Sequence, residues 1–182
     1  MRVGLISAVL ASALMVVPGV AAAPAKKAPA AACPAKPALP PELAGWTRNS
    51  SNKTIYAYGD ARQSDWPALG AARTGLSLHK YESLKYWVAP DRTPDVFKYG
   101  GMVPIEIKKD GRLIVALDGG AWIDLVRDGV KLKSATHGHG PECSGIRKMV
   151  EFDVTQGRYQ LQIVNAPTAS IHAMAVLRDW LR

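Results

Sequence analysis

Cysteine and histidine are scarce in this sequence of 182 residues, which contains two cysteines and four histidines. Two cysteines are too few for a small fold held together mainly by disulfides. The sequence also lacks a His-Glu-x-x-His metalloprotease motif, a Gly-x-Ser-x-Gly nucleophile motif and a phosphate-binding loop. We therefore expect no nucleophilic catalysis and assign no catalytic residue.

Acidic residues are also few, with 15 Asp and Glu against 23 Lys and Arg and a formal net charge of +8. Arg2 contributes one of these charges, residues 23–45 contribute +2, and residues 46–182 carry the remaining +5. The basic residues of the last segment are scattered among acidic ones and form no run. This pattern favours a soluble basic protein and predicts no nucleic-acid partner.

Long apolar runs are confined to the N-terminus. Arg2 precedes an apolar stretch from Val3 to Val17, and the small residues Val20-Ala21-Ala22 follow. This order predicts a secretory signal over residues 1–22, with cleavage after Ala25 as an alternative. The stretch is shorter than the roughly 20 residues that span a bilayer. We expect a bacterial periplasmic or secreted protein without an integral membrane segment after cleavage.

Residues 23–45 are rich in alanine, proline and lysine. Such a composition cannot bury a core and favours extended chain. We expect a leader over residues 23–45 that is mobile up to Cys33 or Trp46. Residues 46–182 then form a single domain of 137 residues, which is long enough for one hydrophobic core.

Alternation of apolar and polar residues dominates the segment 46–182. It is clearest over residues 103–108, 150–154 and 159–163. The dipeptides Asp110-Gly111 and Asp128-Gly129 separate such runs and are typical of tight turns. The pattern predicts an all-β fold, an antiparallel β-sandwich or jelly roll of about seven to nine strands.

Two parts of this domain are less clear. For residues 60–72 we expect either one short helix or a loop.

Trp122 begins an apolar run, so we expect it in the core. Trp66 and Trp87 lie in less patterned segments and are candidates for a sugar-stacking platform.

The two cysteines are expected to pair, because exported proteins with two cysteines commonly form a disulfide. A bridge between Cys33 and Cys143 closes a loop of about 110 residues. The chain-entropy model assigns about 4–5 kcal/mol to a loop of that length. The bridge would attach the leader to the loop after His139 and would remove Cys143 as a metal ligand.

His137 and His139 form the strongest local candidate for a metal site. On extended chain, side chains two residues apart point the same way, so both imidazoles can share a Cu, Zn or Fe ion. His79, His172 or Glu142 could supply a third ligand. The alternative is a glycine-rich turn in which the imidazoles hydrogen-bond to the backbone.

Arg147 and Lys148 follow this loop and are candidates for binding a carboxylate, a phosphate or a sulfated sugar. The alternative is a solvated strand end without a ligand.

A resemblance to a known family is carried by three segments, Asp110–Leu117, Ala121–Gly129 and Gln156–Ile163. Their order of strands and turns over residues 100–178 resembles the secreted jelly-roll modules of the bacterial pre-peptidase C-terminal type. The resemblance implies a module similar to carbohydrate-binding sandwiches and without catalytic activity.

The segment His137–Phe152 resembles the tail of small exported alphaproteobacterial proteins labelled homogentisate 1,2-dioxygenase. That resemblance implies an alternative, a small dioxygenase with non-haem iron held by two histidines and a carboxylate. From the residues we expect an exported, non-catalytic binding module. Its ligand is a carbohydrate, an anionic envelope surface or a transition metal.

Overall fold

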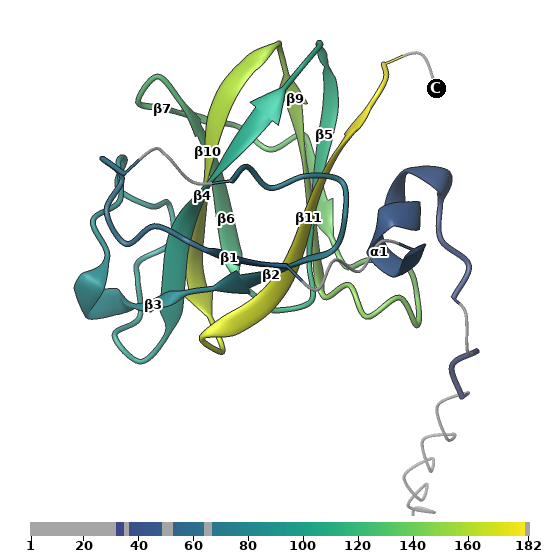
Figure 1. Cartoon of the computed structure of the whole chain (residues 1–182), viewed down its shortest axis with the longest axis horizontal. Helices are drawn as coiled ribbons and strands as arrows, with labels where there is room; N and C mark the ends of the chain where they lie inside the picture. Colours follow the sequence, from purple (N-terminus) through teal and green to yellow (C-terminus); the bar gives the residue numbers. More distant parts are fainter. Residues whose placement is uncertain (1–31, 35–36, 49–52, 64–66, 181–182) are drawn as a thin grey trace, which may run out of the picture. The chain divides into compact units, whose positions relative to one another are not determined.

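Two β-sheets face each other in this computed structural model, which describes residues 32–34, 37–48, 53–63 and 67–180 (Figure 1). Chain contacts separate Met1–Ala32 from a compact unit that spans Cys33–Arg182. The first sheet has the order β1-β2-β11-β5-β9-β8 and the second has the order β3-β4-β10-β6-β7. The β-sandwich predicted from the alternation is confirmed.

The strands of the first sheet are β1 (Thr54–Tyr56), β2 (Thr74–Ser77), β11 (Ser170–Arg178), β5 (Gly111–Leu117), β9 (Lys148–Val154) and β8 (Thr136–Gly138). Those of the second are β3 (His79–Lys80), β4 (Tyr99–Ile107), β10 (Gly157–Ala166), β6 (Trp122–Arg127) and β7 (Val130–Leu132). Strand β1 runs parallel to β2, and the other pairs within the described residues are antiparallel.

The prediction of about seven to nine strands is too low, since the described residues form eleven. Four of them, β1, β3, β7 and β8, are two or three residues long. Alternation cannot be recognised over so few residues. The hairpin predicted at Asp128-Gly129 is present between β6 and β7, and both residues have positive φ, 50° and 76°. The described residues between 60 and 72 form turns and bends rather than a helix.

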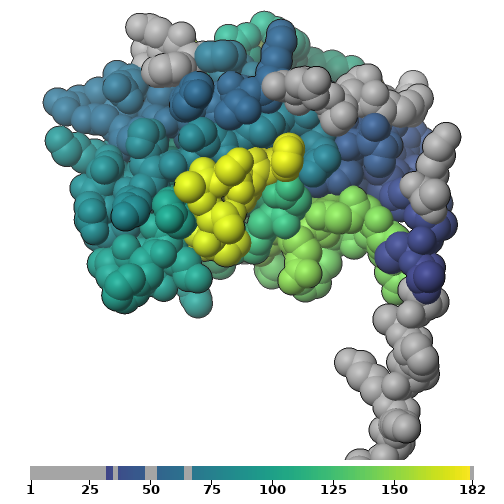
Figure 2. All heavy atoms as spheres, turned by 60° about the horizontal axis from the view of Figure 1, so that its bottom comes forward, coloured from purple at the N-terminus to yellow at the C-terminus, as the bar shows by residue number. Residues whose placement is uncertain are grey.

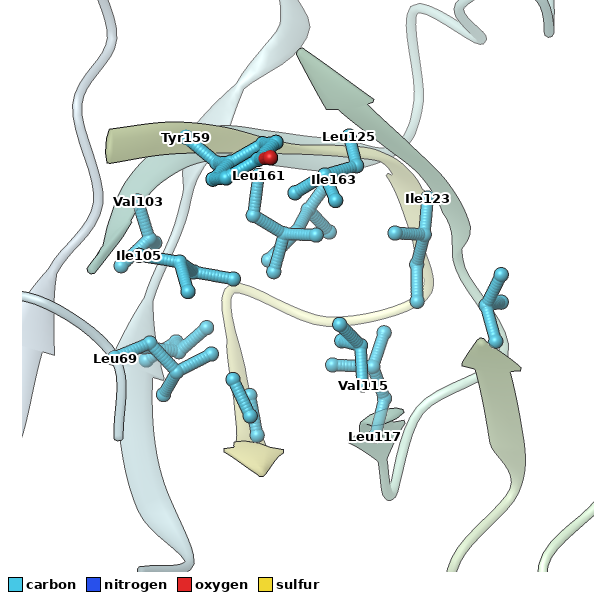
Figure 3. Close-up of a cluster of buried hydrophobic side chains, with 14 of the residues drawn as sticks. Leu69, Val103, Ile105, Val115, Leu117, Ile123, Leu125, Tyr159, Leu161 and Ile163 are labelled. Atoms are coloured by element: carbon cyan, nitrogen blue, oxygen red, sulfur yellow. The ribbon is translucent and has the colours of Figure 1, made fainter. Parts of the chain in front are cut away.

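The main core lies between the two sheets (Figure 3). From β10, Tyr159, Leu161 and Ile163 point toward Val115 and Leu117 of the opposite sheet. Each of these five side chains is at most 3 % exposed. Burial of one such apolar side chain contributes about 1.5–3 kcal/mol. The residues that alternate with them face outward, which leaves the outer face of each sheet to be covered by other segments.

A second apolar cluster lies on the outer face of the first sheet. The short 3-10 helix η1 (Pro41–Ala44) and helix α1 (Gly45–Arg48) place Leu43 and Trp46 against Ile114 and Met174. At Gly45 a side chain would collide with the carbonyl oxygen of Ala71, so this close approach requires glycine. Part of the proline-rich leader is therefore packed against the sandwich. Within the described residues no helix is both long and apolar enough to cross a bilayer.

The Cys33–Cys143 disulfide is present, with a Cα–Cα distance of 5.4 Å, as the cysteine count predicted. It joins the leader to the loop that precedes β9. In Figure 2 the purple N-terminal segment lies beside green atoms from the region that contains Cys143. The bridge and the apolar cluster around Leu43 thus hold the leader at two separate places.

Candidate binding pocket beside Trp87

A long loop, residues 84–98, covers part of the outer face of the second sheet. The Gln162 amide of β10 accepts a bond from the Val88 N–H (3.3 Å) and donates one to the Val88 carbonyl (3.0 Å). Asn165, at the end of the same strand, accepts from the Asp95 N–H (2.7 Å) and donates to the Thr93 carbonyl (3.0 Å). Polar side chains of the sheet therefore supply the hydrogen bonds that a neighbouring strand would otherwise give to the loop backbone.

Asp124 of β6 is a further anchor of this loop. Its buried carboxylate accepts hydrogen bonds from the Asp91 N–H (3.2 Å) and the Trp122 Nε1–H (2.8 Å). Burial raises the pKa of Asp124, and the two hydrogen bonds partly offset that rise. Lys131 of β7 pairs with Asp91 and also donates to the Ala89 carbonyl.

Where the loop leaves the sheet uncovered, a cavity of about 260 Å³ remains, here called the Trp87 pocket. The residues that matter below are Tyr58, Gln63, Trp87, Arg127, Arg158 and Gln160. An adjoining cavity of about 480 Å³ is lined by Asp60, Arg62, Lys85 and Tyr86, and it shares Trp87 and Ala61 with the first. Trp87 is 54 % exposed and lines both cavities.

Gln160 gives the Trp87 pocket its most unusual feature. It is 7 % exposed, yet its side-chain oxygen Oε1 is buried and has no hydrogen-bond partner among the described residues. Gln162, two residues along β10 and on the same face, is 0 % exposed and satisfied by Val88. A buried acceptor without a partner costs about 1–3 kcal/mol, and a ligand donor that reached this oxygen from the cavity lined by Gln160 would relieve that cost.

Charged side chains also line the Trp87 pocket and the adjoining cavity. Arg127 donates to Thr155 Oγ1 (2.7 Å) and to the Tyr159 hydroxyl (3.1 Å), and its guanidinium lies 5.3 Å from the centre of the Tyr159 ring. These contacts fix its direction at the pocket wall. Arg158 also lines the pocket. In the adjoining cavity, hydrogen bonds from Arg62 hold the pKa of Asp60 well below its usual range.

Of the two predicted stacking residues, Trp87 lies at this pocket and Trp66 lies outside the described residues. Gln160, Arg127 and Arg158 were not predicted. Gln160 occupies an outward position of an alternating strand, which sequence alone assigns to solvent. Segments far from it in the sequence, around Tyr58 and Trp87, line the same cavity and lie next to it only in the folded chain.

Three of the four histidines hydrogen-bond to different partners. His79 Nε2 bonds to the Ala57 carbonyl (2.8 Å), and the His172 ring bonds to Asp118 (2.7 Å). His139 Nδ1 bonds to the Arg147 carbonyl (2.8 Å), and His137 lies on the edge strand β8. Within the described residues no three His, Cys, Asp or Glu side chains form a group that could hold a metal ion. The described residues thus contain no two-histidine, one-carboxylate iron site.

The contacts of His172 give it a structural role instead. Asp118, which follows β5, also accepts a bond from the His172 backbone N–H (2.7 Å) and pairs with Arg73 (3.4 Å). Arg73 in turn lies 5.2 Å from the centre of the Trp46 ring. This network ties the end of β5 to β11 and to helix α1.

His137 and Lys148 do come together, in a small cavity that also contains Trp122. The expectation that Trp122 is a core residue is wrong, because it is 38 % exposed. Its neighbours Ile123 and Leu125 take the core-facing positions of β6, so Trp122 and Asp124 lie on the other face. Arg147 does not line this cavity, and Glu142 is exposed on the preceding loop.

The comparisons with known proteins add no further relationship to this geometry. No model of a protein family, no curated protein and no solved structure matches the chain.

Proposed function

We propose that this protein is an exported, non-catalytic binding module that takes a carbohydrate in the Trp87 pocket. The observation that carries the proposal is the exposed Trp87 in a cavity that Gln160 also lines, together with a buried Gln160 oxygen that has no partner among the described residues. Sugars present both groups that such a site needs, hydroxyl donors and an apolar C–H face. The Gln160 oxygen accepts a hydroxyl, and the Trp87 ring stacks on the face of the sugar.

The remaining groups suit the same ligand. Arg127 and Arg158 supply N–H donors for ring and hydroxyl oxygens, and Gln63 offers a second amide at the rim. A cavity of about 260 Å³ is near the lower end of the range for ligand sites, about 300–1,000 Å³, and is suited to one sugar ring. The adjoining cavity allows an oligosaccharide to continue past Trp87.

The strand order supports the finer proposal that the sandwich is a jelly roll. Strands β2-β11-β5-β9 and β4-β10-β6-β7 are successive neighbours in the two sheets. If these eight strands are numbered in chain order from one to eight, the sheets read 1-8-3-6 and 2-7-4-5. This is the arrangement of two interleaved Greek keys, in which the chain repeatedly crosses between the sheets.

Two features support export. The N-terminal residues have the order of a secretory signal, and the Cys33–Cys143 disulfide is stable in an oxidising compartment. An exported protein would encounter carbohydrates of the cell envelope or of the surrounding medium.

A binding screen with soluble polysaccharides tests the proposal. Dextran, laminarin, xylan, pectin and alginate are compared by affinity electrophoresis, and oligosaccharides of any retarding polymer are titrated by calorimetry. Trp87→Ala is expected to weaken binding about tenfold, because it removes a stacking surface. Trp180→Ala is the matched control, since Trp180 is 53 % exposed and lies outside the pocket. Absence of retardation by all five polymers, or equal effects of the two substitutions, contradicts the proposal.

A further inference from the structure

The cavity that contains Trp122, here called the Trp122 pocket, is independent of the Trp87 pocket. It has a volume of about 130 Å³ and is lined by Trp122, Ile123, Ser134, His137, Lys148 and Val150. Strand β6 of one sheet and strands β8 and β9 of the other supply five of these residues, so both sheets contribute to the pocket.

Lys148 contributes a positive charge to this pocket. Its side chain is half-buried, and its ammonium lies 5.9 Å from the centre of the Trp122 ring. Among the described residues it forms no ion pair, and no Asp or Glu lines the pocket. An ammonium group on a half-buried side chain, without an ion-pair partner among the described residues, attracts an anion into the cavity.

The other polar groups of the pocket point to the same kind of ligand. Ser134 supplies a hydroxyl and His137 an imidazole, and both can donate hydrogen bonds. Trp122 contributes its ring, because its N–H is already donated to Asp124. A metal cation at His137 would be repelled by the Lys148 ammonium, whereas an anion is attracted by it.

We propose that the Trp122 pocket binds a tetrahedral oxyanion, the phosphate or sulfate group of a ligand. A volume of about 130 Å³ leaves room for a group of five heavy atoms. Lysine binds phosphate as a point charge, and several oxygens of the anion can accept from Lys148, His137 and Ser134 at once. The site would recognise a phosphorylated or sulfated molecule independently of the Trp87 pocket.

Inorganic phosphate and sulfate are the probes for this site. They are titrated against the ¹⁵N-labelled full chain at constant ionic strength, with chloride as the reference anion, and the indole N–H resonance of Trp122 is followed. Saturable shifts in the millimolar range are expected. Lys148→Gln should weaken binding about tenfold, since a hydrogen bond to a charged group is lost, and Lys148→Arg should restore most of it.

Lys80→Gln is the matched control. Lys80 is exposed on β3 of the second sheet and lies outside the Trp122 pocket, and its replacement removes the same charge from the molecule. It should change the affinity by less than about twofold, as expected for screened surface charge. Equal weakening in Lys80→Gln and Lys148→Gln, or shifts that grow linearly without saturation, would overturn the proposal. So would a stronger response to acetate, or saturable Zn²⁺ binding that His137→Gln abolishes while phosphate has no effect.

Discussion

At the scale of single residues, the two glutamines of β10 show how one residue type serves two purposes. Gln162 is fully satisfied by Val88 and holds the covering loop, whereas the Gln160 oxygen has no partner among the described residues. Both positions look alike in the sequence, since each alternates with an apolar residue of the same strand. Alternation identifies the face of the sheet but not what lies on it.

Replacement of each glutamine by methionine, which has a similar length, separates these roles. Gln162→Met should lower the free energy of unfolding by about 2 kcal/mol, because the N–H and carbonyl of Val88 lose their partners. Gln160→Met should leave it unchanged or raise it by up to about 1 kcal/mol, because an unpaired acceptor is removed. Urea titrations measure both, and equal destabilisation by the two substitutions contradicts this assignment.

Asp124 makes a prediction about pH. Burial raises its pKa in the folded state, so the fold favours the neutral acid. The resulting stability is fully present below the unfolded pKa, near 3.9, and is lost as the pH rises through the higher folded pKa. The free energy of unfolding of the wild type, measured relative to that of Asp124→Asn, should therefore increase as the pH falls from 7 toward 4. A constant difference, or one of opposite sign, refutes the inferred shift.

At the scale of elements, alternation was sufficient for the long strands and insufficient for the short ones. Strands β4, β9 and β10 lie where the pattern predicted them. Strands β3 and β8 exist because a longer neighbour, β4 or β9, offers them an edge. The sequences of β3 and β8 alone do not predict these strands, which can be recognised only in the assembled sheet.

The leader provides a second lesson at this scale. Its proline and alanine content predicts extended chain, yet Leu43 is 1 % exposed against the first sheet. Leu43 and Leu39 pack beside Trp46 against the sheet, and the average composition of the segment does not show these two positions.

Leu43→Ala tests this docking. The substitution should lower the free energy of unfolding by about 2–4 kcal/mol, because it opens a cavity among Ile114, Ile146 and Met174. Val130→Ala is the control, since Val130 is exposed on β7 and its truncation should cost less than about 0.5 kcal/mol. A loss below about 1 kcal/mol for Leu43→Ala in chemical denaturation contradicts the packing.

At the scale of the whole molecule, the disulfide was predictable and the binding pocket was not. Two cysteines allow one intramolecular pairing, so the cysteine count was sufficient to predict it. The Trp87 pocket is assembled from the loop 84–98, the segment around Tyr58 and three strands of the second sheet. Sequence reasoning proposed Trp87 as a stacking residue and could not place Gln160 in the same pocket.

Loss of the bridge should weaken the whole fold. The double substitution Cys33→Ser and Cys143→Ser is expected to lower the free energy of unfolding by about 2–5 kcal/mol, since it releases a loop of 110 residues in the unfolded chain. Urea titration of oxidised wild type against the variant measures the loss. Reduction of the wild type should reproduce it, and identical midpoints for all three samples rule out a stabilising bridge.

The measurement closest to the central claim is calorimetric titration of Gln160→Met with the oligosaccharide that the wild type binds. The unpaired oxygen of Gln160 is assigned to a ligand hydroxyl, so the variant should keep its fold and its stability while its affinity falls about tenfold. Unchanged affinity in a folded Gln160→Met variant would show that the ligand lies elsewhere and would contradict the account.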